Sequence, residues 1–453
     1  MNRADQKGDH FTAHTFKADK NQTMTTSQAS VVLEDLQQQD AEPSLQQSPR
    51  RWWLLLLLFT AMLIGYAHRG ALSVAVASSS MTADLHLSNA GIGVLLSAFF
   101  WVYAFTQVPA GWVVDRFGVR RAYSLGLAFW SVTSALTGFA TGFASLLGLR
   151  VAVGAGQAIA FPATSRAVAN WFRQRERGTV TGIYLTGVRF GTALINLVGA
   201  YFLARYSWKL FFIVIGLVPL IWLLPWWKFL GPLETSTGGA HSPSTSKVSF
   251  LKGLSMIRQR SVLGIFLGFF AYDYAWFVFI TWLPRYLKTE RGFTDGEMGI
   301  YSAVPFLIMS LIIVLSGILS DRLVDRGWNE TRTRKIFVLI GLAIGCLIVP
   351  AGLVTDRMTA VWLLTISLSG LGIASPNTWT LTQAVCPKKI VGTISGIQNF
   401  GGNVGGILAP ALTGLIAHAT ESFALALGLT GAVLVGGMVA YWFLVSDKVE
   451  VNE

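Results

Sequence analysis

The segment GTVTGI at residues 178–183 recurs as GTISGI at residues 392–397, which is 214 residues further along the chain. Three more pairs match at the same spacing: Pro162 with Pro376, Gly187 with Gly401, and Gly191 with Gly405. Several matches in one register indicate that a unit of the chain has been duplicated. Because both copies run in the same direction, the repeat predicts two parallel copies, an arrangement that one large class of membrane proteins shares.

Twelve mostly apolar runs surround this repeat, and each is long enough for a helix that crosses a bilayer, which takes about 20 residues. The runs are 52–78, 89–113, 121–141, 143–168, 178–204, 209–230, 260–286, 297–320, 335–355, 358–381, 392–418 and 421–445. All are predicted to be helical, because lipid offers no hydrogen-bond partner to exposed backbone groups. A polar break after the sixth run divides the twelve helices into two groups of six. Together with the repeat, this division predicts an all-α membrane protein of two six-helix bundles related by pseudo-two-fold symmetry.

The composition argues against a soluble protein. The 453-residue chain is 53% hydrophobic and 13% charged, whereas soluble domains carry about 25% charged residues. The net charge of +12 is typical of positive cytoplasmic loops in so apolar a chain, so we expect a lipid bilayer and no nucleic acid as partner. The two cysteines and the absence of paired Cys/His spacings predict no disulfide framework, no metal and no cofactor.

The distribution of positive residues predicts the orientation. With the amino terminus inside, inner loops hold nineteen Lys and Arg residues and outer loops hold six: Arg205, Lys209, Arg285, Lys288, Arg291 and Arg357. This asymmetry places both termini in the cytoplasm. We expect a disordered cytoplasmic tail at 1–50 without a cleavable signal peptide, bundles at 51–230 and 260–446, a cytoplasmic linker at 231–259 and a cytoplasmic tail at 447–453.

The loop after the second run reads GWVVDRFGVRR at residues 111–121, and a degraded copy, GILSDR, stands at residues 317–322. This loop resembles the signature of the major facilitator superfamily, and the resemblance extends over all twelve runs. It implies a transporter in which these loops form the inner gate. The gating residues would be Gly111, Asp115, Arg116, Gly118, Arg120, Asp321 and Arg322.

Two of these residues have a physical rationale of their own. Gly111 would allow close helix approach. Asp115 can cap a facing helix amino terminus, where the dipole is positive. Its charge network with the neighbouring arginines would hold the inner gate shut while the protein faces outward.

Three further segments narrow the resemblance: GYAHRGALSVA at 65–75, ITWLPRYL at 280–287 and IQNFGGN at 397–403. They are similar to the anion:cation symporter family, which includes bacterial hexuronate, galactonate and glucarate transporters and sialin-type organic anion transporters. The resemblance implies import of an organic anion, such as a sugar acid, often together with protons. It also implies a multi-pass protein of the bacterial inner membrane rather than an enzyme, and we expect it to be a monomer.

Three arginines inside the apolar runs agree with an anionic substrate. Helix registers place Arg69 and Arg150 at one level in the outer half and Arg189 near the midplane. A membrane-centre arginine costs about 2.5–3.5 kcal/mol on insertion scales, and its planar fork pairs bidentately with carboxylate. Arg69 resembles the family's substrate-binding arginine. Arg150 could instead tie two helices together, and Arg189 could pair with Asp273 or face a packed polar seam.

Polar side chains could complete the site. Tyr103 falls where relatives place a substrate-contacting tyrosine, although a packing role is the alternative. Gln398 and Asn399 offer donors and acceptors suited to sugar hydroxyls.

Energy coupling is the main departure from the family pattern. His68 stands where the family usually has Asp, and Gln157 where it usually has Glu. His68 and Asp273 therefore remain as candidate proton-carrying groups near mid-membrane. An unperturbed histidine titrates near about 6.5, so protonation of His68 and anion binding at Arg69 could favour each other. The alternative is an uncoupled facilitator of the same anions.

Two other classes fit less well. Exporters of cationic or apolar compounds usually carry Gly-Pro near the end of the fifth helix, and residues 187–201 contain no proline. An intramembrane enzyme or sensor would need a catalytic motif such as His-Glu-x-x-His or Gly-x-Ser-x-Gly, and neither occurs.

Overall fold

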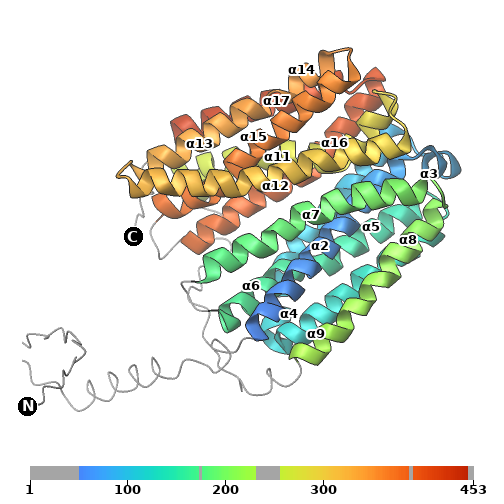
Figure 1. The fold of residues 1–453 in the computed structure, drawn as a ribbon, viewed down its shortest axis with the longest axis horizontal. Coiled ribbons are helices and arrows are strands. Elements are labelled where there is room, and N and C mark those ends of the chain that lie inside the picture. The colour runs from blue at the N-terminus through green and yellow to red at the C-terminus, as the bar shows by residue number, and fades with distance from the viewer. Residues whose placement is uncertain (1–49, 173–175, 231–255, 387–390, 447–453) are drawn as a thin grey trace, which may run out of the picture. The chain divides into compact units, whose positions relative to one another are not determined.

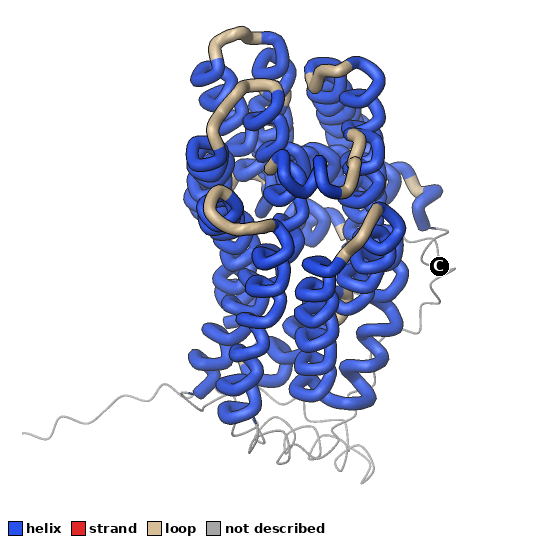
Figure 2. Tube along the Cα trace, turned by 90° about the vertical axis from the view of Figure 1, so that its right-hand side faces the viewer, coloured by secondary structure: helices blue, strands red, loops and turns tan. Residues whose placement is uncertain are grey.

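The computed structural model describes residues 50–172, 176–230, 256–386 and 391–446. All regular elements in these ranges are helices, which short loops connect (Figure 2). The predicted tails and most of the predicted linker lie outside the described residues. The described residues belong to one compact unit.

The first half of this unit contains the helices that Figure 1 colours blue to light green. They are α2 (Arg50–Ala77), α3 (Ser79–Asp84), α4 (Asn89–Leu136), α5 (Phe143–Gln157), α6 (Ala160–Trp171), α7 (Arg177–Leu203), α8 (Trp208–Leu217) and α9 (Leu223–Leu230), with 3-10 turns at Thr137–Phe139 and Val218–Trp222.

The second half contains the helices coloured yellow to red. They are α11 (Arg260–Thr289), α12 (Asp295–Asp325), α13 (Glu330–Gly345), α14 (Ile348–Leu353), α15 (Arg357–Val385), α16 (Val391–Thr420) and α17 (Ala424–Val439), with a 3-10 turn at Met256–Arg258 before them and a π-helical turn at Ala440–Leu444 after them.

Eleven helices of the described residues are long and apolar enough to cross a membrane. The difference from the twelve predicted runs lies in α4, which contains the second run and most of the third. It bends at Gly118, whose φ of 80° and ψ of 156° are not helical. Glycine adopts a positive φ readily because it has no Cβ atom, so Gly118 separates the two predicted helices.

Prolines explain where other predicted runs are interrupted. The run 143–168 is divided into α5 and α6 shortly before Pro162, and the run 335–355 into α13 and α14 shortly before Pro350. Proline lacks the N–H that would bond the carbonyl four residues earlier, so the preceding turn loosens. In the run 209–230, Pro219 stands in the 3-10 turn between α8 and α9.

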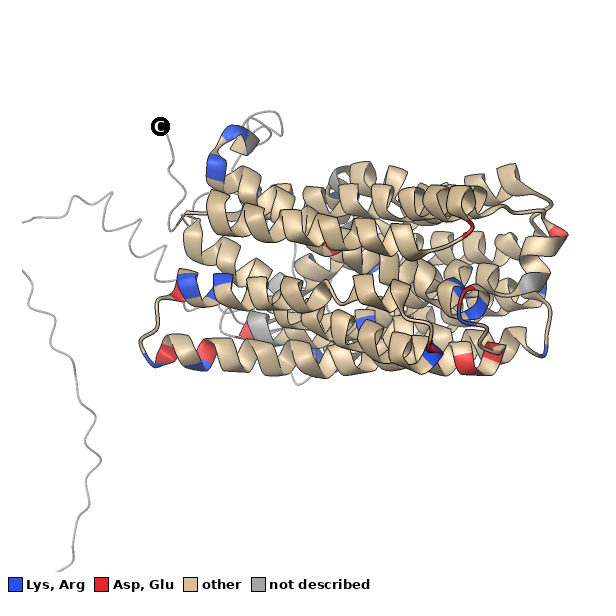
Figure 3. Ribbon diagram, turned by 90° about the horizontal axis from the view of Figure 1, so that it is seen from above, with Lys and Arg blue, Asp and Glu red and all other residues tan. Residues whose placement is uncertain are grey.

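The two halves meet along three helix pairs: α4 with α16, α7 with α12, and α2 with α11. Glycines bring the first pair together. A Cβ atom at Gly93 would lie 2.7 Å from the Pro410 carbonyl oxygen, and one at Gly414 would lie 2.6 Å from the Asn89 carbonyl oxygen. We call the end of the helices where α4 begins the Asn89 end, and the opposite end the Gly118 end. Charged residues gather toward these two ends, and few lie between them (Figure 3).

Candidate functional site

Arg69 lies in an aromatic cage on α2. Its side chain is buried, and its Cζ atom lies 4.4 Å from the ring centre of Tyr66, 4.6 Å from Phe99 and 4.5 Å from Tyr103. Nη1 donates to the Tyr66 hydroxyl at 3.2 Å. Ring faces attract a cation, so the cage holds the positive charge without a carboxylate. The predicted substrate residues Arg69 and Tyr103 are thus in direct contact.

Gln157, at the end of α5, fixes the other edge of this guanidinium. Its Oε1 accepts from Arg69 Nε at 3.1 Å, and its Nε2 donates to the Gly65 carbonyl at 3.1 Å. Both ends of the buried amide are therefore used. A neutral amide can accept and donate at once, whereas an ionised carboxylate only accepts. The residue that replaces the family's carboxylate thus positions Arg69.

Arg150 lies against the same aromatic group. Its Cζ atom is 5.7 Å from the Phe99 ring centre, its side chain is buried, and its Nε has no hydrogen-bond partner among the described residues. Phe99 therefore lies close to both guanidinium groups, at the shared level that the helix registers predict. The unpartnered Nε is a donor available to a ligand.

Arg189 connects the two halves near mid-helix. From α7, Nη2 donates to the Ser375 hydroxyl on α15 at 3.3 Å, and Cζ lies 5.0 Å from the Trp276 ring centre. Within the part of the chain that the structure describes, its buried Nε has no hydrogen-bond partner. Among the ion pairs of the described residues, none within 4 Å joins Arg189 to Asp273, so the alternative of direct pairing is not realised in this conformation.

Asp273 lies on α11, within electrostatic range of Arg189 and, more weakly, of Arg69. A Cβ atom at Gly402 would lie 2.0 Å from its Oδ2. The carboxylate therefore packs directly on the α16 backbone, where only glycine leaves room for it. Asp273 therefore acts electrostatically on two of the predicted anion-binding arginines.

His68 faces in a different direction from its neighbour Arg69. Its buried Nε2 donates to the Ile215 carbonyl on α8 at 2.6 Å, and its Nδ1 has no partner. The ring thus contacts α8 of the same half rather than the aromatic cage.

Gln398 and Asn399 lie on α16. Gln398 is fully buried, and its Nε2 approaches the Thr378 carbonyl at 3.4 Å, whereas its Oε1 has no partner. Asn399 is half-buried, and its backbone carbonyl accepts from Asn403. Gln398 therefore keeps an acceptor available, but its observed contact is with α15 and not with the Arg69 cage.

The predicted gate loop lies at the Gly118 end. Arg120 stacks on Trp227 of α9, with Cζ 3.9 Å from the ring centre, and donates to the Trp227 carbonyl at 3.2 Å. Arg116 is exposed, near the rings of Trp112 and Phe117. The side chain of Asp115 lies outside the described part of the chain.

Gly111 requires a correction. A Cβ atom at this position would meet no atom within 4 Å. Among the described residues, the close helix approach predicted for Gly111 is therefore not present in this conformation.

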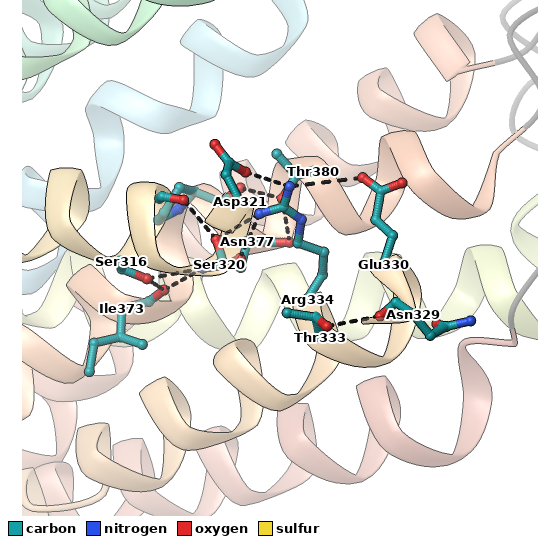
Figure 4. Close-up of polar contacts among 12 residues, drawn as sticks. Ser316, Ser320, Asp321, Asn329, Glu330, Thr333, Arg334, Ile373, Asn377 and Thr380 are labelled. Carbon is teal, nitrogen blue, oxygen red and sulfur yellow. Dashed lines mark hydrogen bonds and ion pairs between the residues drawn. The ribbon is translucent and has the colours of Figure 1, made fainter. Parts of the chain in front are cut away.

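In the second half, Arg334 is the centre of a polar cluster (Figure 4). From α13, its Nη2 binds the Asp321 carboxylate at 2.6 Å, and its Nη1 donates to the Ser320 hydroxyl at 2.6 Å and approaches Asn377 Oδ1 at 3.5 Å. Glu330 lies 3.9 Å from Nη2. The cluster joins α12, α13 and α15.

The partner of Asp321 is thus Arg334 and not its neighbour Arg322, whose side chain is exposed. Sequence reasoning missed Arg334 as the partner of Asp321. The available signal was a basic residue placed immediately before an apolar run. Tyr66 was missed too, although it lies three residues before Arg69 and hence on the same helix face.

The chain resembles known transporters along most of its length. The family model described as Major Facilitator Superfamily matches residues 57–410. A D-galactonate transporter of Escherichia coli O6:H1 is 33% identical, covering 88% of this chain and 96% of its own. A hexuronate transporter of Bacillus subtilis is 31% identical, covering 84% and 92%. A probable galactarate/D-glucarate transporter of Escherichia coli K12 is 30% identical, covering 88% and 95%.

Two solved structures share the fold. One is a bacterial homologue of the human lysosomal transporter Spinster in an inward-facing, unoccupied conformation, with a TM-score of 0.71, 18% identity, and coverage of 89% of this chain and 100% of that one. The other is a D-xylose-proton symporter, with a TM-score of 0.68, 15% identity, and coverage of 87% and 98%. The resemblance inferred from the sequence motifs is therefore confirmed, and the chain belongs to the Major Facilitator Superfamily.

Proposed function

We propose that this protein is a secondary active transporter that imports an organic anion by alternating access. The substrate would be a sugar acid, such as a hexuronate or an aldonate, or a similar carboxylate. The observation that carries the proposal is the buried guanidinium of Arg69, which aromatic rings and neutral oxygens hold in place. The sugar-acid names of the relatives support the same substrate class.

Charge balance favours an anion over a cation. Arg69, Arg150 and Arg189 lie in or beside the candidate site, and Asp273 lies within electrostatic range of Arg189 and Arg69. A buried positive charge without an equal number of carboxylates is costly. A bound carboxylate would offset that cost through charge-assisted hydrogen bonds. The unpartnered Nε atoms of Arg150 and Arg189 and Oε1 of Gln398 would serve the carboxylate and the hydroxyls.

Uptake by purified protein in proteoliposomes tests this function. We expect counterflow of at least one radiolabelled acid from a panel of D-galactonate, D-glucuronate and D-galactarate, with competition by the other acids. A cationic dye should be neither transported nor competitive. Transport of the cation with no response to any acid would contradict the proposal and favour the exporter alternative.

The proposal also includes the predicted location, orientation, oligomeric state and gating residues. The protein would lie in the bacterial inner membrane as a monomer, with both termini and the Gly118 end in the cytoplasm. The predicted bundles at 51–230 and 260–446 would move as the two halves of the transporter. Asp115, Arg116 and Arg120, together with the Asp321 cluster, would stabilise the closed inner gate.

Proton symport is the coupling that we propose, with Asp273 and His68 as the two groups to test. An ionised Asp273 competes with a substrate anion for the nearby guanidinium groups, whereas its protonated form does not. Proton and anion binding at this location would therefore favour each other. His68 would act less directly, because its ring is bonded to α8.

An imposed pH gradient across proteoliposomes distinguishes the possibilities. We expect the wild type to accumulate substrate above equilibrium, and Asp273→Asn to lose accumulation while retaining downhill exchange. His68→Ala is the parallel variant, and loss of accumulation there alone would assign coupling to His68. A wild type that never accumulates substrate would instead indicate an uncoupled facilitator.

A further inference from the structure

Arg285 joins the two halves at the Asn89 end. It lies in the last turns of α11, and both of its hydrogen-bond acceptors belong to the first half. Its Nε donates to Asn89 Oδ1 at 2.9 Å, and its Nη1 donates to the Val76 carbonyl. One side chain thus holds the end of α2 and the start of α4 against α11.

The Val76 carbonyl is well suited to this contact. Val76 is the second-last residue of α2, and the last four carbonyls of a helix have no partner within it. The carboxyl end of a helix also carries the negative end of its dipole. A guanidinium placed there satisfies an unbonded oxygen and interacts favourably with the dipole.

Other contacts between the halves lie at the same end. Ser73, one turn before Val76, donates to the Thr281 carbonyl, one turn before Arg285. Asn196 of α7 donates to the Ser302 carbonyl of α12 at 3.1 Å. Together with the close approach of α4 and α16, these contacts close the Asn89 end.

Both acceptors of Arg285 are neutral, and both lie in the opposite half. Acidic groups at this end have other partners: Asp84 accepts from Trp208, Asp295 pairs with Lys288, Glu290 accepts from Ser422, and Glu297 pairs with Arg357. If the halves separated at this end, Arg285 would lose both acceptors and keep an unpaired positive charge at the opening.

We propose that Arg285 is the latch of the gate at the Asn89 end. In the closed state it binds Asn89 and Val76, and in the open state its guanidinium receives a carboxylate of the arriving organic anion. The anion replaces the lost acceptors, so its binding favours the open gate. The proposal rests on alternating access and an anionic substrate, but its first test requires no substrate.

Arg291 provides a matched control. It lies at the same end and also makes hydrogen bonds, but its acceptors are Tyr286, Ala351 and Val354, all within the second half. Replacing it removes an arginine of similar position without removing a contact between the halves.

Distances between spin labels measure the gate in the full-length protein. The two native cysteines, Cys346 and Cys386, are first replaced. One pair of introduced cysteines, at positions 141 and 419, then reports the distance at the Asn89 end, and a second pair, at positions 228 and 328, reports the Gly118 end. The native residues Thr141, Ala419, Lys228 and Trp328 are all exposed. Without substrate, we expect Arg285→Gln to raise the ratio of open to closed populations at the Asn89 end about tenfold. This factor is at the lower end of the effect expected when a hydrogen bond to a charged group is lost. Arg291→Gln should leave this ratio unchanged.

Two further variants keep the result interpretable. Asn89→Ala, which removes one acceptor and no charge, should shift the same populations in the same direction by a smaller factor. Titration with D-glucuronate should open the Asn89 end in the wild type and in Arg285→Lys, which keeps the charge, but much less in Arg285→Gln. Unchanged distances in Arg285→Gln and Asn89→Ala would overturn the latch, even if transport proceeds. Failure of every acid to be transported would overturn the proposed substrate class and leave the distance result standing.

Discussion

Replacement of Arg69 by alanine should reduce anion uptake by about 100-fold or more. The guanidinium is buried in a cage of three aromatic rings, and Gln157 fixes its orientation. Removing one partner of a buried charge pair costs roughly 2–5 kcal/mol, so a substrate carboxylate would lose most of its binding energy. Initial rates of uptake into proteoliposomes, at equal amounts of inserted protein, measure the effect.

Two other variants show whether the loss is specific to Arg69. Arg69→Lys should also lose most of the uptake, because an ammonium group cannot reproduce the planar fork that bonds Gln157 and a carboxylate together. Arg205→Ala removes an exposed arginine that also stacks on an aromatic ring, Tyr201, with 3.8 Å between Cζ and the ring centre. It should transport normally. Near-normal uptake by Arg69→Ala would remove this residue from the site.

Replacement of Arg334 by alanine should give the largest loss of stability. Its side chain is 7% exposed and makes charged contacts to Asp321 together with hydrogen bonds to Ser320 and Asn377. Hydrogen bonds to charged groups contribute about 1.5–3 kcal/mol each, so we expect about 2–3 kcal/mol lower stability after partial rearrangement. Thermal unfolding in detergent, followed by tryptophan fluorescence, would show a lower midpoint.

Arg322→Ala is the control for this prediction. Arg322 is the immediate neighbour of Asp321, but its side chain is exposed, so its removal should leave the unfolding midpoint nearly unchanged. Equal midpoints for Arg334→Ala and the wild type would show that the cluster around Asp321 contributes no net stability.

The helices were predictable because lipid leaves the backbone no other arrangement. Each predicted run overlaps at least one helix of the structure, and the bend at Gly118 falls between two runs. Breaks inside runs, such as that between α5 and α6, depend on how one proline changes the preceding turn. Hydropathy averaged over a window does not resolve that effect.

The site was only partly predictable, because a sequence gives a residue's register and not its partner. His68 and Arg69 are neighbours, and successive residues on a helix point about 100° apart, so they face α8 and the aromatic cage respectively. The pairing of Asp321 with Arg334 rather than Arg322 depends on the meeting of α12 and α13. Such contacts between helices follow from packing.

Gln157 has a consequence for how the transporter would behave in environments of different acidity. Its amide holds Arg69 and the Gly65 carbonyl together, and an amide neither gains nor loses a proton in the physiological range. The arginine that would receive the substrate therefore keeps its orientation whether the surrounding medium is mildly acidic or mildly alkaline. In the proposed mechanism, any pH dependence of anion affinity would therefore come from Asp273 or His68 and not from the group that orients Arg69.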